Sequence, residues 1–324
     1  MPGGGGGAVS LDRQRVGRQL HLTRLHGLPA GSHHGGRTVN GDEVVRFAPL
    51  EGWVRTTHAE EVWGTVVTFD VRDAELDADA HRAVADAAAY LHQVDAWFST
   101  YRLDTPITAL RHGLSTYHQM PAIVRHVLDR CAEARDLTNG VFDPWSVPGG
   151  VDPSGYVKGW AADSVADMIV ARGYPNVSVN AAGDVTCRGL QSPGSPWVVG
   201  IRHPDDPMSV IRVVSALDCA VATSGEYERG HHIIDPRTHR SEVQLQSATV
   251  VGPDGGLADA LATALLIAGA DGVTWFAGLG VWSAYLVADD QATYFGPAFA
   301  PSTEPDQAGH SATSHPTHDE RTPS

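Results

Sequence analysis

Hydrophobic positions change their spacing several times between residues 62 and 287. Residues 63–71 are rich in β-branched and aromatic side chains, which predicts a strand. Across residues 79–97 the apolar side chains recur every three or four positions, which predicts a helix. The same patterns predict helices from Pro121 to the Thr-Asn-Gly at 138–140, over 160–170 and over 257–268, and strands over 177–180, 197–202, 210–214, 219–222, 248–252 and 281–287.

The order of these elements predicts the fold class. Helices and strands interleave, but strands also follow one another directly between residues 197 and 251. We therefore expect an α+β fold, a single mixed α/β domain with largely antiparallel sheets flanked by helices, over residues 58–297. Residues 1–57 are rich in Gly, Arg and His, and residues 298–324 in Pro, Ser, Thr and His, so both are predicted to be disordered tails.

Composition excludes several classes of protein. The 324 residues carry a formal net charge of −15, which argues against a nucleic-acid partner. Cys131, Cys187 and Cys219 are widely spaced and form no CxxC pair, which favours free thiols over a disulfide framework or a zinc site. Neither a membrane segment nor the apolar region of a signal peptide is evident, so we expect a cytoplasmic protein.

The segment VDPSGYVKGWAAD, at residues 151–163, combines an acid, glycines and one cation ahead of a predicted helix. Asp152 opens it, Gly155 permits a turn or a close approach to a ligand, and Lys158 with Gly159 closes the expected loop. Such a loop suits a phosphate-bearing ligand, although it is not a P-loop, because GxxxxGK[ST] is absent. An ordinary loop that enters a helix would have the same composition.

Asp259 and Thr263 are four residues apart in the first turns of a predicted helix, so their side chains share one face. Both offer oxygen, the ligand atom that a hard cation such as Mg²⁺ prefers. The alternative is an Asp that caps the helix and a Thr that bonds back to the backbone.

Residues 223–232, TSGEYERGHH, form a polar segment between apolar ones, where ligand contacts tend to lie. Ser224 lacks the GxSxG context of a hydrolytic nucleophile. A histidine here suits general-base chemistry near neutral pH, but a pair of surface histidines fits equally well. Aromatic residues such as Trp63, Tyr101 and Phe142 can stack a flat ring or simply belong to the core.

Eight segments occur in a fixed order between residues 62 and 269: VWGTVVTF, FSTYR, TNGVFDPW, VDPSGYVKGWAAD, VNAAGDV, PWVVGIRHP, VATSGEYERGHHIIDPRT and ADALATALLIAG. Together they resemble the ApbE-type flavin transferases, the FAD:protein FMN transferase family, and most of all its actinobacterial branch. The resemblance implies an ApbE-like fold and a transferase that takes FAD as substrate. With Mg²⁺, such an enzyme moves FMN onto a Ser or Thr hydroxyl of a target flavoprotein and releases AMP.

The resemblance also implies roles for individual residues. It places the metal on the carbonyl of Gly155 and the side chains of Asp259 and Thr263, and it makes His232 and Asp259 the catalytic residues, with His232 positioning or deprotonating the acceptor hydroxyl. Its FAD contacts correspond to Trp63, Tyr101, Val141, Phe142, Asp143, Asp152, Lys158 and Ile234.

The chain departs from the family pattern at a few positions. Trp63 replaces the usual Met, Ala182 replaces the second glycine of GGD, and His239 stands where Gly usually follows DPxT. Ala182 restricts its turn if a positive φ is needed there. Two alternatives stay open from the sequence: a FAD pyrophosphatase that yields FMN and AMP, and a non-catalytic FAD-binding protein.

Overall fold

A computed structural model describes residues 31–33, 52–225, 234–240, 243–288 and 291–299. Its centre is a nine-stranded sheet with the order β1-β12-β11-β10-β9-β5-β4-β3-β2, in which every pair is antiparallel. The strands are β1 (Gly31–His33), β2 (Val54–Val62), β3 (Thr65–Asp73), β4 (Val177–Ala181), β5 (Asp184–Arg188), β9 (Cys219–Gly225), β10 (Ser247–Gly252), β11 (Ser283–Ala288) and β12 (Gln291–Phe295). The expected α+β class with largely antiparallel strands is confirmed.

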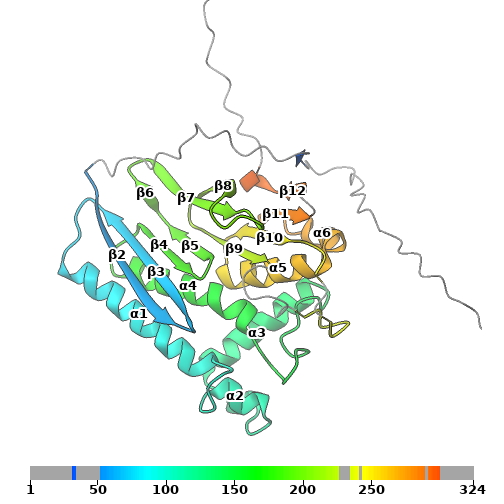
Figure 1. Cartoon of the computed structure of the whole chain (residues 1–324). Helices are drawn as coiled ribbons and strands as arrows, with labels where there is room; N and C mark the ends of the chain where they lie inside the picture. Colours follow the sequence, from blue (N-terminus) through cyan, green and yellow to red (C-terminus); the bar gives the residue numbers. More distant parts are fainter. Residues whose placement is uncertain (1–30, 34–51, 226–233, 241–242, 289–290, 300–324) are drawn as a thin grey trace, which may run out of the picture.

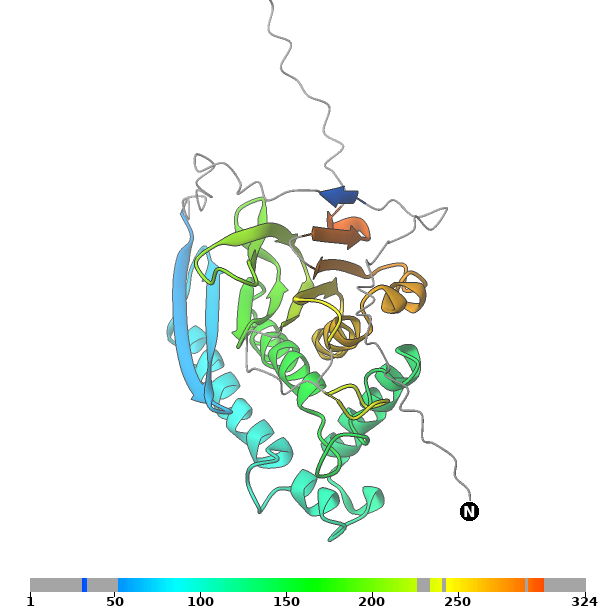
Figure 2. The same ribbon diagram turned by 45° about the vertical axis from the view of Figure 1, so that its right-hand side comes forward.

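Helices cover one face of this sheet, and a second, three-stranded sheet packs on the other side (Figure 1). The helices are α1 (Ala78–Phe98), α2 (Pro106–Arg111), α3 (Ala122–Leu137), α4 (Ser154–Ala171), α5 (Gly255–Ala268) and α6 (Ala270–Phe276), and the small sheet consists of β6 (Leu190–Ser192), β7 (Ser195–Arg202) and β8 (Val210–Ala216). Figure 2 shows α1, α4 and α5 against the large sheet, with α2 and α3 farther out.

The larger hydrophobic core lies between the helices and the sheet. The stripe predicted for residues 79–97 faces it, because Val84, Leu91 and Val94 are buried in α1. In α5 every residue but Thr263 is buried, so this helix runs through the core instead of along its surface. Within the described residues, no helix has both the length and the apolar character that crossing a membrane requires.

The predicted start of the central helix is wrong. Residues 154–159 are not a loop but the first turns of α4, whose N-cap is Pro153. The Asp152 side chain, just before the cap, accepts a hydrogen bond from the Ser154 amide at 3.0 Å. Glycine is a poor helix former, which explains why the pattern indicated a later start. Gly159 lies where α4 contacts α5, and a side chain at this position would collide with the backbone of Gly255. The absence of a side chain therefore lets the two helices approach closely.

Two hairpin turns have a positive φ at both central residues, and the first of them replaces part of an expected strand. Trp63 and Gly64, which were assigned to a strand, form the two-residue turn between β2 and β3, with φ values of 58° and 70°. Ala182 and Gly183 join β4 to β5 in the same way, with φ values of 55° and 102°. Positive φ at both central positions is the type I′ arrangement, which matches the twist of paired strands. The alanine at 182 therefore does occupy a backbone conformation that favours glycine.

The sheet extends beyond the boundaries expected for the folded domain. β2 begins at Val54, and β1 pairs with β12, so both contribute strands from the segment assigned to the leader. Phe299, beyond the expected end at residue 297, is fully buried in the smaller core. Thr223–Gly225, expected in a loop, continue strand β9. Cys131, Cys187 and Cys219 are free thiols.

Candidate functional site

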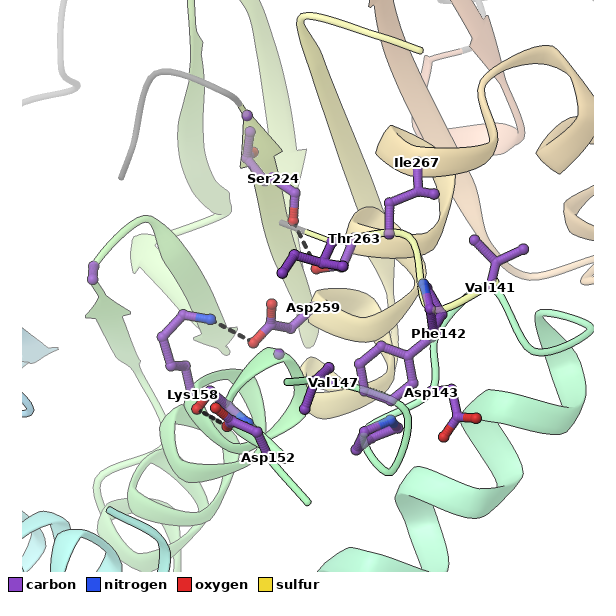
Figure 3. A pocket seen from close by; sticks show the side chains of 18 of the residues that line it. Val141, Phe142, Asp143, Val147, Asp152, Lys158, Ser224, Asp259, Thr263 and Ile267 are labelled. Carbon is purple, nitrogen blue, oxygen red and sulfur yellow. Dashed lines mark hydrogen bonds and ion pairs between the residues drawn. The ribbon is translucent and has the colours of Figure 1, made fainter. Parts of the chain in front are cut away.

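A cavity of about 480 Å³ opens where α4, α5 and the end of β9 meet the segment that follows α3. Its wall carries side chains from every one of these elements (Figure 3). Nine of the residues singled out from the sequence line it: Val141, Phe142, Asp143, Asp152, Gly155, Lys158, Ile234, Asp259 and Thr263. Residues from four separate stretches of the chain thus converge on one cavity.

Two of the remaining three predicted positions do not line the cavity. Trp63 is in the β2–β3 turn and does not line the cavity, and Tyr101 projects into solvent with 91% of its surface exposed. His232 lies outside the described residues, so its place relative to the cavity stays a prediction.

An ion pair between neighbouring helices lines the cavity. The Lys158 ammonium, from the second turn of α4, lies 2.7 Å from Oδ2 of Asp259 in α5, and Figure 3 shows the two side chains pointing at each other. Lys158 also lies 3.1 Å from Oδ2 of Asp184, the first residue of β5. Desolvation opposes the charge of Lys158, but the two carboxylates outweigh it and raise the pKa of this lysine above its usual value. The lysine is therefore a fixed cation.

A second polar contact adjoins the first. The Ser224 hydroxyl, at the end of β9, lies 3.0 Å from the Thr263 hydroxyl, one helical turn beyond Asp259 (Figure 3). Gly155 faces the same threonine, because a Cβ at this glycine would lie 3.7 Å from Oγ1 of Thr263 and 3.3 Å from the ring of Phe142. Residues of α4, α5 and β9 therefore meet at Thr263.

Other carboxylates accept hydrogen bonds from the backbone and side chains of the segments around the cavity. Asp143 accepts hydrogen bonds from the Trp145 amide and the Ser146 hydroxyl, and Asp152 accepts one from the Ser154 amide. Asp163, in α4, accepts a hydrogen bond from the Gly255 amide at 2.5 Å and so ties α4 to the first residue of α5. Burial raises the pKa of Asp163, against the opposing effect of that amide and of Arg188.

The structure adds participants that sequence reasoning did not assign. Asp184 belongs to the VNAAGDV segment that was noted for its pattern, but nothing local indicated that its carboxylate meets Lys158. Ser224 was considered solely as a nucleophile, whereas it is a hydrogen-bond partner of Thr263. Thr65, Arg202 and Thr223 also line the cavity.

Comparison with known proteins agrees with this arrangement. Residues 146–282, which include all of α4, β9 and α5, match the model of the ApbE family. A FAD:protein FMN transferase from Vibrio cholerae is 38% identical over 129 residues, and one from Rhodobacter capsulatus is 32% identical over 228 residues. Over these residues the chain is similar to the ApbE family. The match covers 37% of this chain for the first relative and 67% for the second.

The fold of ApbE proteins accounts for most of the structure. The solved flavin transferase ApbE from Vibrio cholerae superimposes with a TM-score of 0.66 at 23% identity, over 76% of this chain and 98% of that one. In sequence, the aligned part of the chain spans 39% and 41% of the two curated relatives. Less than half of each of these ApbE relatives is therefore represented in the sequence match.

Proposed function

We propose that this protein is a FAD:protein FMN transferase, which uses Mg²⁺ to move FMN from FAD onto a Ser or Thr hydroxyl of a target flavoprotein. The observation that carries the proposal is the convergence of Lys158, Asp259 and Thr263 on one cavity, in a chain whose relatives bear that enzyme's name. The acceptor oxygen would form a phosphoester bond with the FMN phosphorus, the bond from that phosphorus to AMP would break, and the hydroxyl proton would pass to a base.

Three oxygen donors among the residues that line the cavity suit a magnesium ion: the Asp259 carboxylate, the Thr263 hydroxyl and the Gly155 carbonyl. Among the described residues, no cluster of three His, Cys, Asp or Glu side chains is placed to hold a metal ion. Mg²⁺ typically takes one or two carboxylates and completes its shell with water and substrate phosphates. When bound, such an ion would neutralise charge on the pyrophosphate.

The chain's own residues would then divide the remaining work. Lys158 is a fixed cation that lines the cavity and suits a phosphate oxygen as a point charge. Ser224 would orient the Thr263 hydroxyl through their hydrogen bond, and Phe142 forms an apolar wall beside Gly155. His232 as the residue that positions or deprotonates the acceptor hydroxyl, the FAD contacts of Trp63 and Tyr101, and a cytoplasmic location stay predictions.

The test is incubation with FAD, Mg²⁺ and a candidate acceptor protein. Transfer predicts a flavin-fluorescent acceptor band that survives denaturation, an FMN adduct on Ser or Thr by mass spectrometry, and one AMP for each adduct. Asp259→Ala should abolish AMP release while the circular dichroism spectrum stays unchanged. Asp271→Ala, which removes an exposed carboxylate from α6, is the matched control and should retain activity.

The same assay separates the alternatives. Free FMN and AMP without an adduct on any acceptor would indicate a FAD pyrophosphatase, in which water takes the place of the hydroxyl. FAD binding without AMP at any divalent metal concentration would indicate a non-catalytic flavin-binding protein. Either result would refute the proposed transfer.

A further inference from the structure

We infer that Asp184 is a positioning residue that retains the Lys158 ammonium when a divalent cation takes Asp259, an inference that rests on the proposed function. Lys158 Nζ lies between the two carboxylates, 2.7 Å from Asp259 Oδ2 and 3.1 Å from Asp184 Oδ2. The side chains of Asp259 and Asp184 are 4% and 5% exposed, so both carboxylates are shielded from water.

Lysine and cation compete for the same carboxylate. In the structure one oxygen of Asp259 already contacts the ammonium, and a cation that coordinates Asp259 would bring a second positive centre next to it. Two positive charges that contact the same carboxylate repel each other strongly when the site is shielded from water. Binding of the cation therefore requires that Lys158 withdraw from Asp259.

Asp184 is placed to receive the lysine. It stands directly after the β4–β5 turn and pairs with Ala181 through the sheet, so its backbone is fixed. Asp259 is among the residues that line the cavity and Asp184 is not, so Asp259 is the carboxylate that faces an entering cation. A small rotation of the Lys158 side chain toward Asp184 would free Asp259 while the ammonium keeps a buried counter-ion.

This arrangement also explains why one lysine has two buried acids. Asp184 serves the lysine, and Asp259 serves the cation.

The experiment measures Mn²⁺ and Mg²⁺ affinity by calorimetry on the full chain without FAD, in a double-mutant cycle. Asp184→Asn should weaken cation binding by roughly tenfold or more, because a charged hydrogen bond that receives Lys158 is lost. Lys158→Met should tighten cation binding by about tenfold, because the competitor is gone. In the Lys158→Met background, Asp184→Asn should change the affinity by less than about threefold, since no lysine remains to be received.

Several outcomes would overturn the inference. If Asp184→Asn lowers the cation affinity equally in both backgrounds, Asp184 acts on the cation itself, either as a direct ligand or through its negative charge, and not through Lys158. Unchanged or weaker cation binding by Lys158→Met would refute competition for Asp259, and this result does not depend on whether the Asp184 variant folds. Circular dichroism and thermal unfolding of each variant identify any loss of structure.

Two further variants separate this inference from the proposed function. Asp259→Asn should abolish the binding isotherm; if the wild type shows no binding that depends on Asp259, the proposed cation site and the inference both fail. If that binding is present and the cycle is additive, the inference alone fails. Asp218→Asn removes an exposed carboxylate at the β8–β9 turn and should leave the affinity within about twofold.

Discussion

Gly159→Ala adds one methyl group at the place where α4 meets α5. A Cβ at Gly159 would overlap the carbonyl oxygen of Gly255 and lie 3.0 Å from the Gly256 amide nitrogen. The contact is reciprocal, because a Cβ at Gly255 would lie 2.5 Å from the carbonyl oxygen of Gly159. Carbon–oxygen contacts between packed elements normally measure about 3.3–3.6 Å, so the helices would have to separate by roughly 1 Å.

The free energy of unfolding follows from two opposing effects. Alanine is a better helix former than glycine, which by itself would stabilise α4 by about 1 kcal/mol. Overpacking typically costs about 1–3 kcal/mol, and here the upper end applies because the obstructing atoms belong to the backbone and cannot rotate away. We therefore expect Gly159→Ala to lower the free energy of unfolding by about 2 kcal/mol.

Thermal and urea unfolding would measure this loss. For a domain of this size, about 2 kcal/mol corresponds to a fall in Tm of roughly 4–8 °C. Gly280→Ala is the matched control: Gly280 has nothing within 4 Å of its added Cβ and no positive φ, so the variant should equal or slightly exceed the wild type in stability. A Gly159→Ala protein as stable as the wild type would refute the close approach of α4 and α5.

Two other substitutions test local features of the fold. Ala182→Gly should raise the free energy of unfolding by roughly 0.5–1 kcal/mol, since φ at this position is 55°. Ala181→Gly, in the buried strand beside it, is the control and should lower the free energy of unfolding. If thermal unfolding shows no stabilisation by Ala182→Gly, the turn geometry is contradicted. The Arg237 guanidinium, 2.8 Å from Asp235, lowers the pKa of that carboxyl by hydrogen bonding, so the pair stabilises the fold above the usual carboxyl pKa and its contribution is lost as pH falls through the lowered pKa. Asp235→Asn should thus be less stable than the wild type at neutral pH. In urea titrations the two should become equally stable in acid, once the pH lies below the lowered pKa of Asp235, and a gap in stability that persists there would argue against the pair.

Some elements were predictable because their patterns are local. α1 and α3 place apolar residues at helical spacing against a single core, so their spans agree with the predicted ones to within a few residues. α5 was also predicted, although its burial on all sides is invisible to a periodicity test. β2 and β12 were missed, because each lies toward an outer part of the sheet and carries mostly exposed or half-buried side chains.

The candidate site divides in the same way. Residue types and order identified the acid, the lysine and the Asp–Thr pair, and they sufficed for the resemblance to a family of flavin transferases. The distance of 2.7 Å between Lys158 and Asp259 joins residues 101 positions apart, and no local pattern encodes it. That distance depends on how closely α4 and α5 pack, which the glycines at 159 and 255 permit.

The sequence by itself therefore determined the fold class, most of the helices and the chemical groups available to the site, because these depend on side-chain type and on spacing along a short stretch. Tertiary structure alone decided where α4 begins, which carboxylates meet Lys158, and that Ala182 has a positive φ. The physical reason is that these properties arise from close packing and burial between distant segments, where a single methyl group or a shielded charge outweighs the preference of the local sequence.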